Sequence, residues 1–261
     1  MRYLILGCGW VGQSAAAKWL GDGHEVWAST TTLEKYHRLQ DDGIFAFQYD
    51  FDTHDLPVES MPTVFDFILV SIPATNRHTV EVLRARFERV HTFLNRLQYQ
   101  KLIFLSSIGI YPDISAYIDE YRLNEDSLHG KLKLAEQSIG QMERVHIFRL
   151  GGLFGKNRIF AKYFENKICS TGGQPANFVH VDDVTTLLEL AFRSDLQHPI
   201  YNVVAPEHPL KKDVILAAAA KYNMALPSSF EDVDSFQKIV LGDLLQNELN
   251  YSFKFPSPLG F

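Results

Sequence analysis

Three glycines near the start of the chain have the spacing of a dinucleotide-binding turn. Residues Gly7 to Gly12 read GCGWVG, which fits G-x-G-x-x-G between an apolar run and a helical pattern. In such a turn Gly7 permits the tight bend, Gly9 a close approach to a pyrophosphate, and Gly12 close helix–strand packing. The diphosphate lies at the helix N-terminus, where free N–H groups favour anions, so we expect Trp10 and Val11 to contact the cofactor. A purely structural strand-to-helix turn is the alternative.

Hydroxyl side chains stand where NAD-binding proteins carry an acid. Ser29, Thr30 and Thr31 end the second apolar segment, and no Asp or Glu lies among them. An acid there would bond the ribose 2′-hydroxyl of NAD and repel a 2′-phosphate. Lys35 and Arg38 follow closely enough to help hold that phosphate. The sequence therefore favours NADP, with NAD as the alternative, unless these hydroxyls only cap the next helix.

A serine, a histidine and a lysine form a second candidate group. Ser107 ends an apolar run, and His129 and Lys133 lie four residues apart in a helical segment. Residues four apart on a helix share one face, and histidine can exchange a proton near neutral pH. The alternatives are structural: a surface His129, a Ser107 that bonds only backbone, and a Lys133 that holds only a ribose.

Strand-like and helix-like segments alternate over the first 150 residues. Such alternation predicts right-handed βαβ units and an α/β fold with a doubly wound parallel sheet. We interpret residues 1–150 as a Rossmann-type dinucleotide-binding core. The expected strands are 3–6, 24–29, 44–49, 65–72, 101–106 and 145–150, and the expected helices are 10–20, 79–97 and 128–142.

The sequence pattern changes after Leu150, where glycine and proline become frequent and the expected helices and strands become shorter. We interpret residues 151–261 as a smaller substrate-binding lobe that is interleaved with the core. Its expected strands are 177–181 and 200–204, its expected helices are 184–193 and 210–222, and residues 253–258 form an extended tail.

Several segments in the same order resemble the extended short-chain dehydrogenase/reductases, the NAD-dependent epimerase/dehydratase family, and its atypical bacterial members. The resemblance spans essentially the whole chain. The segments are YDFD at 49–52, VSIPA at 70–74, LSSIGIY at 105–111, RLGGLFG at 149–155 and FVHVDDV at 178–184.

The resemblance implies roles for particular residues. Asp50 and Phe51 would lie near the adenine, and Ser107 would be the catalytic serine that hydrogen-bonds the substrate carbonyl. Residues beside the cofactor would be Ser71, Ile72, Pro73, Leu150 and Gly151.

One departure from the family concerns its catalytic Tyr-x-x-x-Lys pair. The aligned residues are His129 and Lys133, so the lysine is present and the tyrosine is replaced by histidine. The resemblance implies an NAD(P)-dependent oxidoreductase or epimerase/dehydratase that acts on a small polar substrate, such as a nucleotide sugar or a hydroxy or keto compound. The alternative is a catalytically inactive NADP(H)-binding sensor or scaffold. A dehydrogenase with an all-helical second half fits poorly, because residues 177–204 contain strand patterns.

Loops at the strand ends carry the expected substrate contacts, since such loops set specificity in α/β folds. We expect Tyr111, Arg158 and His180 to bind substrate, although His180 could instead be a structural histidine. Tyr111 or Tyr121 could supply a phenol in place of the missing one. Asp182 and Asp183 are expected to cap the helix that follows them.

Composition limits the partners. The formal net charge of −6 and a pI of about 5.9 argue against nucleic acid and suit a small diffusible substrate. Two cysteines imply no disulfide framework, and apolar runs are too short for a membrane span, so we expect a cytoplasmic protein. The histidines lack metal-ligand spacing, so no metal is expected, and a homodimer is compatible with the sequence.

Overall fold

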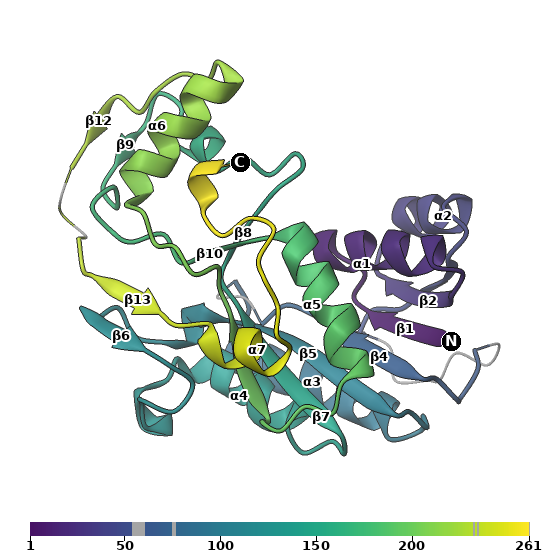
Figure 1. Ribbon diagram of the computed structural model, residues 1–261. Coiled ribbons are helices and arrows are strands. Elements are labelled where there is room, and N and C mark those ends of the chain that lie inside the picture. The colour runs from purple at the N-terminus through teal and green to yellow at the C-terminus, as the bar shows by residue number, and fades with distance from the viewer. Residues whose placement is uncertain (54–60, 75–76, 232, 234, 261) are drawn as a thin grey trace.

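The centre of the molecule is a seven-stranded parallel sheet, seen in a computed structural model that describes every residue except 54–60, 75–76, 232, 234 and 261 (Figure 1). The strand order is β11-β7-β5-β4-β1-β2-β3. The chain adds β2 and β3 on one side of β1 and then crosses to add β4 on the other side, so the order of strands reverses beside β1. Open α/β sheets bind ligands at the carboxyl ends of strands beside such a reversal. The predicted α/β class with a Rossmann-type sheet is therefore confirmed. The strands are β1 (Arg2–Leu6), β2 (Glu25–Thr30), β3 (Phe45–Gln48), β4 (Phe67–Val70), β5 (Lys101–Ser107), β7 (Val145–Leu150) and β11 (Ile200–Val203).

Helices cover both faces of this sheet. On one face α1 (Trp10–Gly21) packs beside α5 (Val181–Arg193), and α2 (Leu33–Asp41) covers the edge formed by β2 and β3. On the other face α3 (Val80–Leu94) packs against α4 (Gly130–Ile139). Alternate side chains of β1 enter the two cores, which explains why its sequence is continuously apolar.

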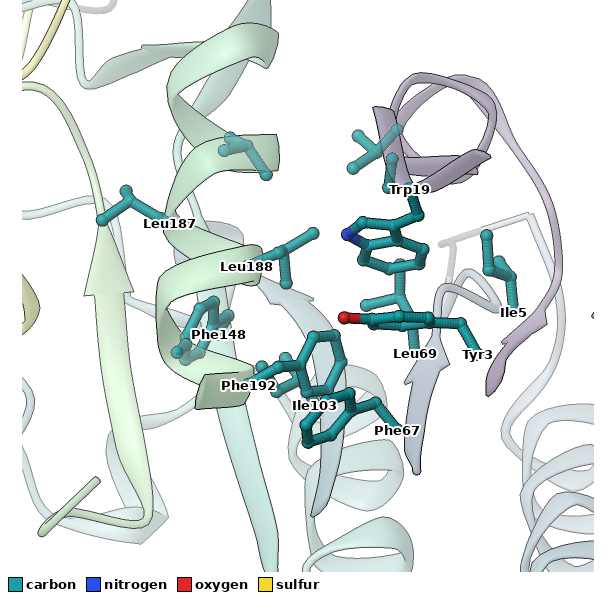
Figure 2. Close-up of a cluster of buried hydrophobic side chains, with 14 of the residues drawn as sticks. Tyr3, Ile5, Trp19, Phe67, Leu69, Ile103, Phe148, Leu187, Leu188 and Phe192 are labelled. Carbon is teal, nitrogen blue, oxygen red and sulfur yellow. The ribbon is translucent and has the colours of Figure 1, made fainter. Parts of the chain in front are cut away.

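Aromatic packing joins α1, β1 and α5. The indole of Trp19 stacks on the Tyr3 ring with 4.4 Å between centroids, and Phe192 meets both rings edge-on (Figure 2). These side chains are buried, so they fix the C-terminal half of the first helix against the start of β1, at the end of the helix away from the dinucleotide turn.

Helix α3 packs an apolar stripe with a spacing of three and four residues against the sheet. Leu83, Phe87, Val90 and Leu94 are buried against the sheet. Val80 has the same spacing but is exposed, because it is the first residue of the helix.

The second part of the chain returns to the first. Strand β11 extends the main sheet beside β7, and β6 (Ala116–Ile118) pairs with β13 (Lys238–Val240) near the other end of the chain. The predicted division at residue 150 stays a prediction. The remaining small sheets pair β8 (Gly152–Phe154) with β10 (Phe178–His180) and β9 (Ile168–Cys169) with β12 (Ser229–Phe230), and the last helices are α6 (Lys211–Tyr222) and α7 (Asp243–Glu248).

Helix α5 begins at Val181, three residues earlier than expected. His180 is its N-cap, and the ring Nδ1 accepts a hydrogen bond of 3.1 Å from the Asp182 N–H. Asp182 and Asp183 therefore lie in the first turn, and the expectation that they cap the helix is wrong.

Asp183 instead fixes the C-terminal tail. Its buried carboxylate accepts the Tyr251 hydroxyl at 2.6 Å and the N–H groups of Lys254 and Phe255 at 2.7 and 3.1 Å. The extended tail predicted for 253–258 thus packs against the start of α5. Within the described ranges, no helix has both the length and the apolar character needed to cross a bilayer.

Candidate active site and dinucleotide groove

The glycine turn after β1 has the geometry that its sequence predicts. Gly7 has φ +77°, and a Cβ there would lie 2.9 Å from Cγ1 of Ile72. Gly9 is the N-cap of α1 and offers no side-chain cap, so the first turn of the helix keeps free N–H groups. A Cβ on Gly12 would lie 3.1 Å from Cγ2 of Ile5, which shows the close packing of helix on strand.

A groove of about 650 Å³ lies over this turn at the carboxyl ends of β1, β2 and β4. Gly12 lies beneath it, where it packs on β1. Nearly all residues predicted to bind the cofactor's adenosine and diphosphate line the groove, namely Gly7, Gly9, Trp10, Val11, Ser29, Thr30, Thr31, Asp50, Phe51, Ser71, Ile72 and Pro73.

The β2 end of the groove carries hydroxyls and a lysine. Ser29 is buried, and its Oγ accepts a hydrogen bond of 2.8 Å from the Gly7 N–H, so it also supports the turn. Thr32 is the N-cap of α2 but makes no side-chain capping bond. Lys35 lines the groove, and burial followed by the charge of Arg38 lowers the pKa of its ammonium group despite the neighbouring Cys8. Lys35 makes no ion pair with any residue that the structure describes.

An ion pair between Asp52 and Arg86 also lines the groove. Asp52 accepts two hydrogen bonds from the Arg86 guanidinium, at 2.6 and 2.7 Å, and Arg86 also donates to the Pro73 carbonyl at 2.9 Å. These bonds hold the pKa of Asp52 below its usual range. Sequence reasoning missed Arg86, whose only signal was a charge close to the buried stripe of α3.

Arg158, a predicted substrate-binding residue, lines the groove. Its guanidinium stands 4.9 Å from the centre of the Trp10 ring. A tight turn with paired main-chain bonds between Gly155 and Arg158 holds it there. Its cation therefore faces the place where the helix N-terminus would hold a diphosphate.

A second cavity, of about 450 Å³, adjoins the groove at β5 and β7. It shares Val11, Ser71, Ile72, Pro73 and Leu153 with the groove. The predicted residues Ser107, His129, Leu150 and Gly151 line it.

Two of the three predicted catalytic side chains meet in this cavity. Ser107 ends β5, and its Oγ accepts a hydrogen bond of 3.1 Å from the Gly109 N–H. His129 is exposed at the N-cap of α4, where its N–H donates to the Ile110 carbonyl at 2.8 Å. Main-chain bonds therefore place both residues at one edge of the sheet.

Lys133 does not join them. Its Nζ donates to the Glu125 carbonyl at 3.0 Å and lies 3.6 Å from the Asp126 carboxylate. It lines neither the groove nor the cavity. The predicted shared face fails because His129 precedes α4 and is not part of it.

The alternative phenols lie elsewhere. Tyr111 is buried, with its hydroxyl bonded to Asn202 Oδ1 at 2.8 Å and to Arg149 at 2.9 Å. Tyr121 is exposed and its hydroxyl bonds His198. Neither residue lines the cavity of Ser107, so neither hydroxyl replaces the missing tyrosine there.

Behind that cavity runs a buried polar network. Ser106 lines the cavity and donates a hydrogen bond of 2.5 Å to Glu136, which pairs with Arg149 at 2.7 Å. Arg149 continues to Tyr111 and Asn202, so β5, α4, β7 and β11 are joined. Sequence reasoning missed Glu136, although a charge on the sheet-facing side of α4 was a usable signal.

His180 is buried away from these cavities. Besides capping α5, its ring stacks on Phe255 with centroids 3.7 Å apart. The structural reading of this histidine accounts for both contacts, and it does not line the groove or the Ser107 cavity.

Comparison with known proteins gives whole-chain similarities. No family model matches the sequence. Protein YeeZ of Escherichia coli K12 is 27% identical, over 99% of this chain and 97% of its own length. The human epimerase family protein SDR39U1, solved with NADPH, is 16% identical with a TM-score of 0.75, over 99% of this chain and 96% of that one. UDP-glucuronic acid 4-epimerase of Bacillus cereus, solved with UDP-glucuronic acid and NAD, is 15% identical with a TM-score of 0.74, over 100% and 96% of the two chains.

At these identities the solved structures show a shared fold. The fold that the sequence resemblance implies is thereby confirmed. The match covers both the sheet and the residues after Leu150, so it includes the smaller sheets as well as the Rossmann core.

Proposed function

We propose that this chain is an NADP-dependent oxidoreductase or epimerase/dehydratase-like enzyme for a small polar substrate, with His129 in place of the usual tyrosine. One observation carries the proposal: Ser107 and His129 line a single cavity that is continuous with the dinucleotide groove along Val11, Ser71 and Pro73. Proteins of the same fold were solved with NADPH or NAD, which supports the cofactor class.

The residues of the groove fit NADP. A Cβ on Gly9 would meet nothing nearer than the Gly7 carbonyl at 3.8 Å, so the backbone faces open space as a diphosphate requires. Lys35, half-buried and without an acidic partner among the described residues, suits a 2′-phosphate. Bound NADP supplies or accepts a hydride at its nicotinamide.

Ser107 and His129 would act on the substrate oxygen. The Ser107 Oγ accepts the Gly109 N–H, so its own proton can be donated to that oxygen. His129 would exchange the proton that accompanies hydride transfer. Leu132, Leu150 and Leu153 line the same cavity and would exclude water from the reacting atoms.

Turnover with matched variants tests these roles. Purified protein is incubated with NADPH and a panel of aldehydes and ketones, and kcat/KM is compared for Ser107→Ala, His129→Ala and the control His91→Ala. His91 lies on α3, and its ring contacts the Asn95 side chain. We expect losses of roughly 10²- to 10⁴-fold for His129→Ala and no loss for the control. Turnover that is indifferent to changes at both 107 and 129 would refute the assignment.

A catalytically inactive NADP(H) sensor is the second candidate. The observation that favours it is Lys133, whose ammonium is bonded to the Glu125 carbonyl and not directed at the cavity. Binding that discriminates NADP⁺ from NADPH, with no turnover of any panel member, would support the sensor over the enzyme.

A further inference from the structure

A third cavity, of about 510 Å³, continues from the Ser107 cavity into the second part of the chain. Gly109 lines both cavities, so the third begins two residues from the proposed catalytic serine. It extends to α6 and β13, where two lysines line it, Lys211 and Lys238. Nothing in the proposed chemistry uses these cations.

Both ammonium groups make polar contacts with residues of the cavity wall. Lys211 Nζ donates to Gln174 Oε1 at 2.5 Å, and burial followed by the charge of Lys238 lowers its pKa. Lys238 has a side chain that is 12% exposed, and its Nζ contacts Asp113 Oδ1 at 2.6 Å. The Asp113 side chain is 69% exposed, so water screens this carboxylate.

The charge balance of the cavity favours an anion. Its described lining contains two ammonium groups and one carboxylate, and that carboxylate lies largely in water. Two neighbouring cations that are partly removed from water repel each other, and an anion between them converts the repulsion into two attractions.

We infer that this cavity binds an anionic group of the substrate, a phosphate monoester or a carboxylate, between Lys211 and Lys238. The reacting end of the same molecule would then face Ser107 through the opening at Gly109. The existence of an anion site is inferred from the cavity alone, whereas its use by a substrate rests on the proposed function.

Aromatic side chains beside the lysines suggest the probes. Phe178 and Phe236 line the cavity, and Lys238 Nζ lies 5.4 Å from the centre of the Phe236 ring. Phenyl phosphate, benzoate and benzyl alcohol therefore offer the same ring with a phosphate, a carboxylate or no charge. The difference among the three isolates the contribution of the anion.

Calorimetric titration of NADP⁺-saturated protein with these compounds tests the site. We expect phenyl phosphate or benzoate to bind at least tenfold more tightly than benzyl alcohol, and Lys211→Met and Lys238→Met each to weaken the anion about tenfold. The control is Lys212→Met, because Lys212 is the next residue on α6, is exposed and does not line the cavity. A tighter phenyl phosphate assigns a phosphate site, and a tighter benzoate a carboxylate site.

A second variant predicts a change of opposite sign. Asp113→Asn frees Lys238 from its competing carboxylate, so the anion should bind more tightly, by about threefold or more. Equal binding of the anions and the alcohol would overturn the inference, as would losses in Lys212→Met as large as those in Lys211→Met. If NADP⁺ itself fails to bind, the proposed function fails, and the same comparison of variants without cofactor still decides whether the anion site exists.

Discussion

Removing the charge of Glu136 should destabilise the protein strongly. This carboxylate accepts hydrogen bonds from Arg149 Nε at 3.0 Å and Nη2 at 2.7 Å, with side chains only 6% and 3% exposed. Burial opposes the charge of Arg149, but hydrogen bonding to Glu136 raises its pKa overall, so Arg149 stays charged. Glu136→Gln keeps the shape of the side chain and leaves that charge without its partner.

The expected loss follows from the burial of this pair. Breaking a buried ion pair costs about 3 to 5 kcal/mol because the remaining charge is uncompensated. Glutamine keeps one carbonyl oxygen for Arg149 or Ser106, so we expect about 3 kcal/mol, near the lower limit. The double variant Glu136→Leu/Arg149→Met should be more stable than Glu136→Leu alone, since it leaves no charge in the interior.

Urea unfolding followed by circular dichroism measures these differences. The matched control is Glu143→Gln, because Glu143 is exposed beyond the end of α4. The reasoning is refuted if Glu136→Gln costs no more than this control, or if the double variant is no more stable than Glu136→Leu alone.

Three more variants have defined outcomes. Gly7→Ala should lose about 1 to 2 kcal/mol of unfolding free energy and weaken NADP⁺ binding, since φ is +77° and the new Cβ meets Ile72; unchanged stability contradicts this. Asp52→Asn should cost about 1 to 2 kcal/mol at pH 7. Because Arg86 lowers the pKa of Asp52 from 3.8, that cost is present above pH 3.8 and should vanish as pH falls through the lowered value, as pH-dependent unfolding would show. Lys35→Met should weaken NADP⁺ about tenfold and leave NAD⁺ unchanged in parallel titrations; equal losses would place Lys35 elsewhere.

The local sequence pattern was sufficient to predict much of the fold and part of the site. The glycine turn was predictable because the local backbone requires glycine at these positions: Gly7 has a positive φ, and Gly12 allows close contact between helix and strand. The family resemblance predicted Ser107 and His129 in one site, and both line one cavity, Ser107 at the end of β5 and His129 at the start of α4.

Long-range contacts determined what the sequence could not show. Lys133 turns toward Glu125, and Tyr111 turns inward to Asn202, a residue 91 positions away. Arg158 reaches the groove through a tight turn that no periodicity signals, and His180 caps α5 because the helix begins before its acids. In each case the partner of a polar side chain depends on which distant residues the folded chain brings close to it.

Titration with NADP⁺ tests the central claim most directly, with heat and tryptophan fluorescence as signals because Trp10 lines the groove. The account predicts saturable binding of one NADP⁺ per chain, tighter than NAD⁺, with a change in fluorescence. A flat response to both dinucleotides would contradict it.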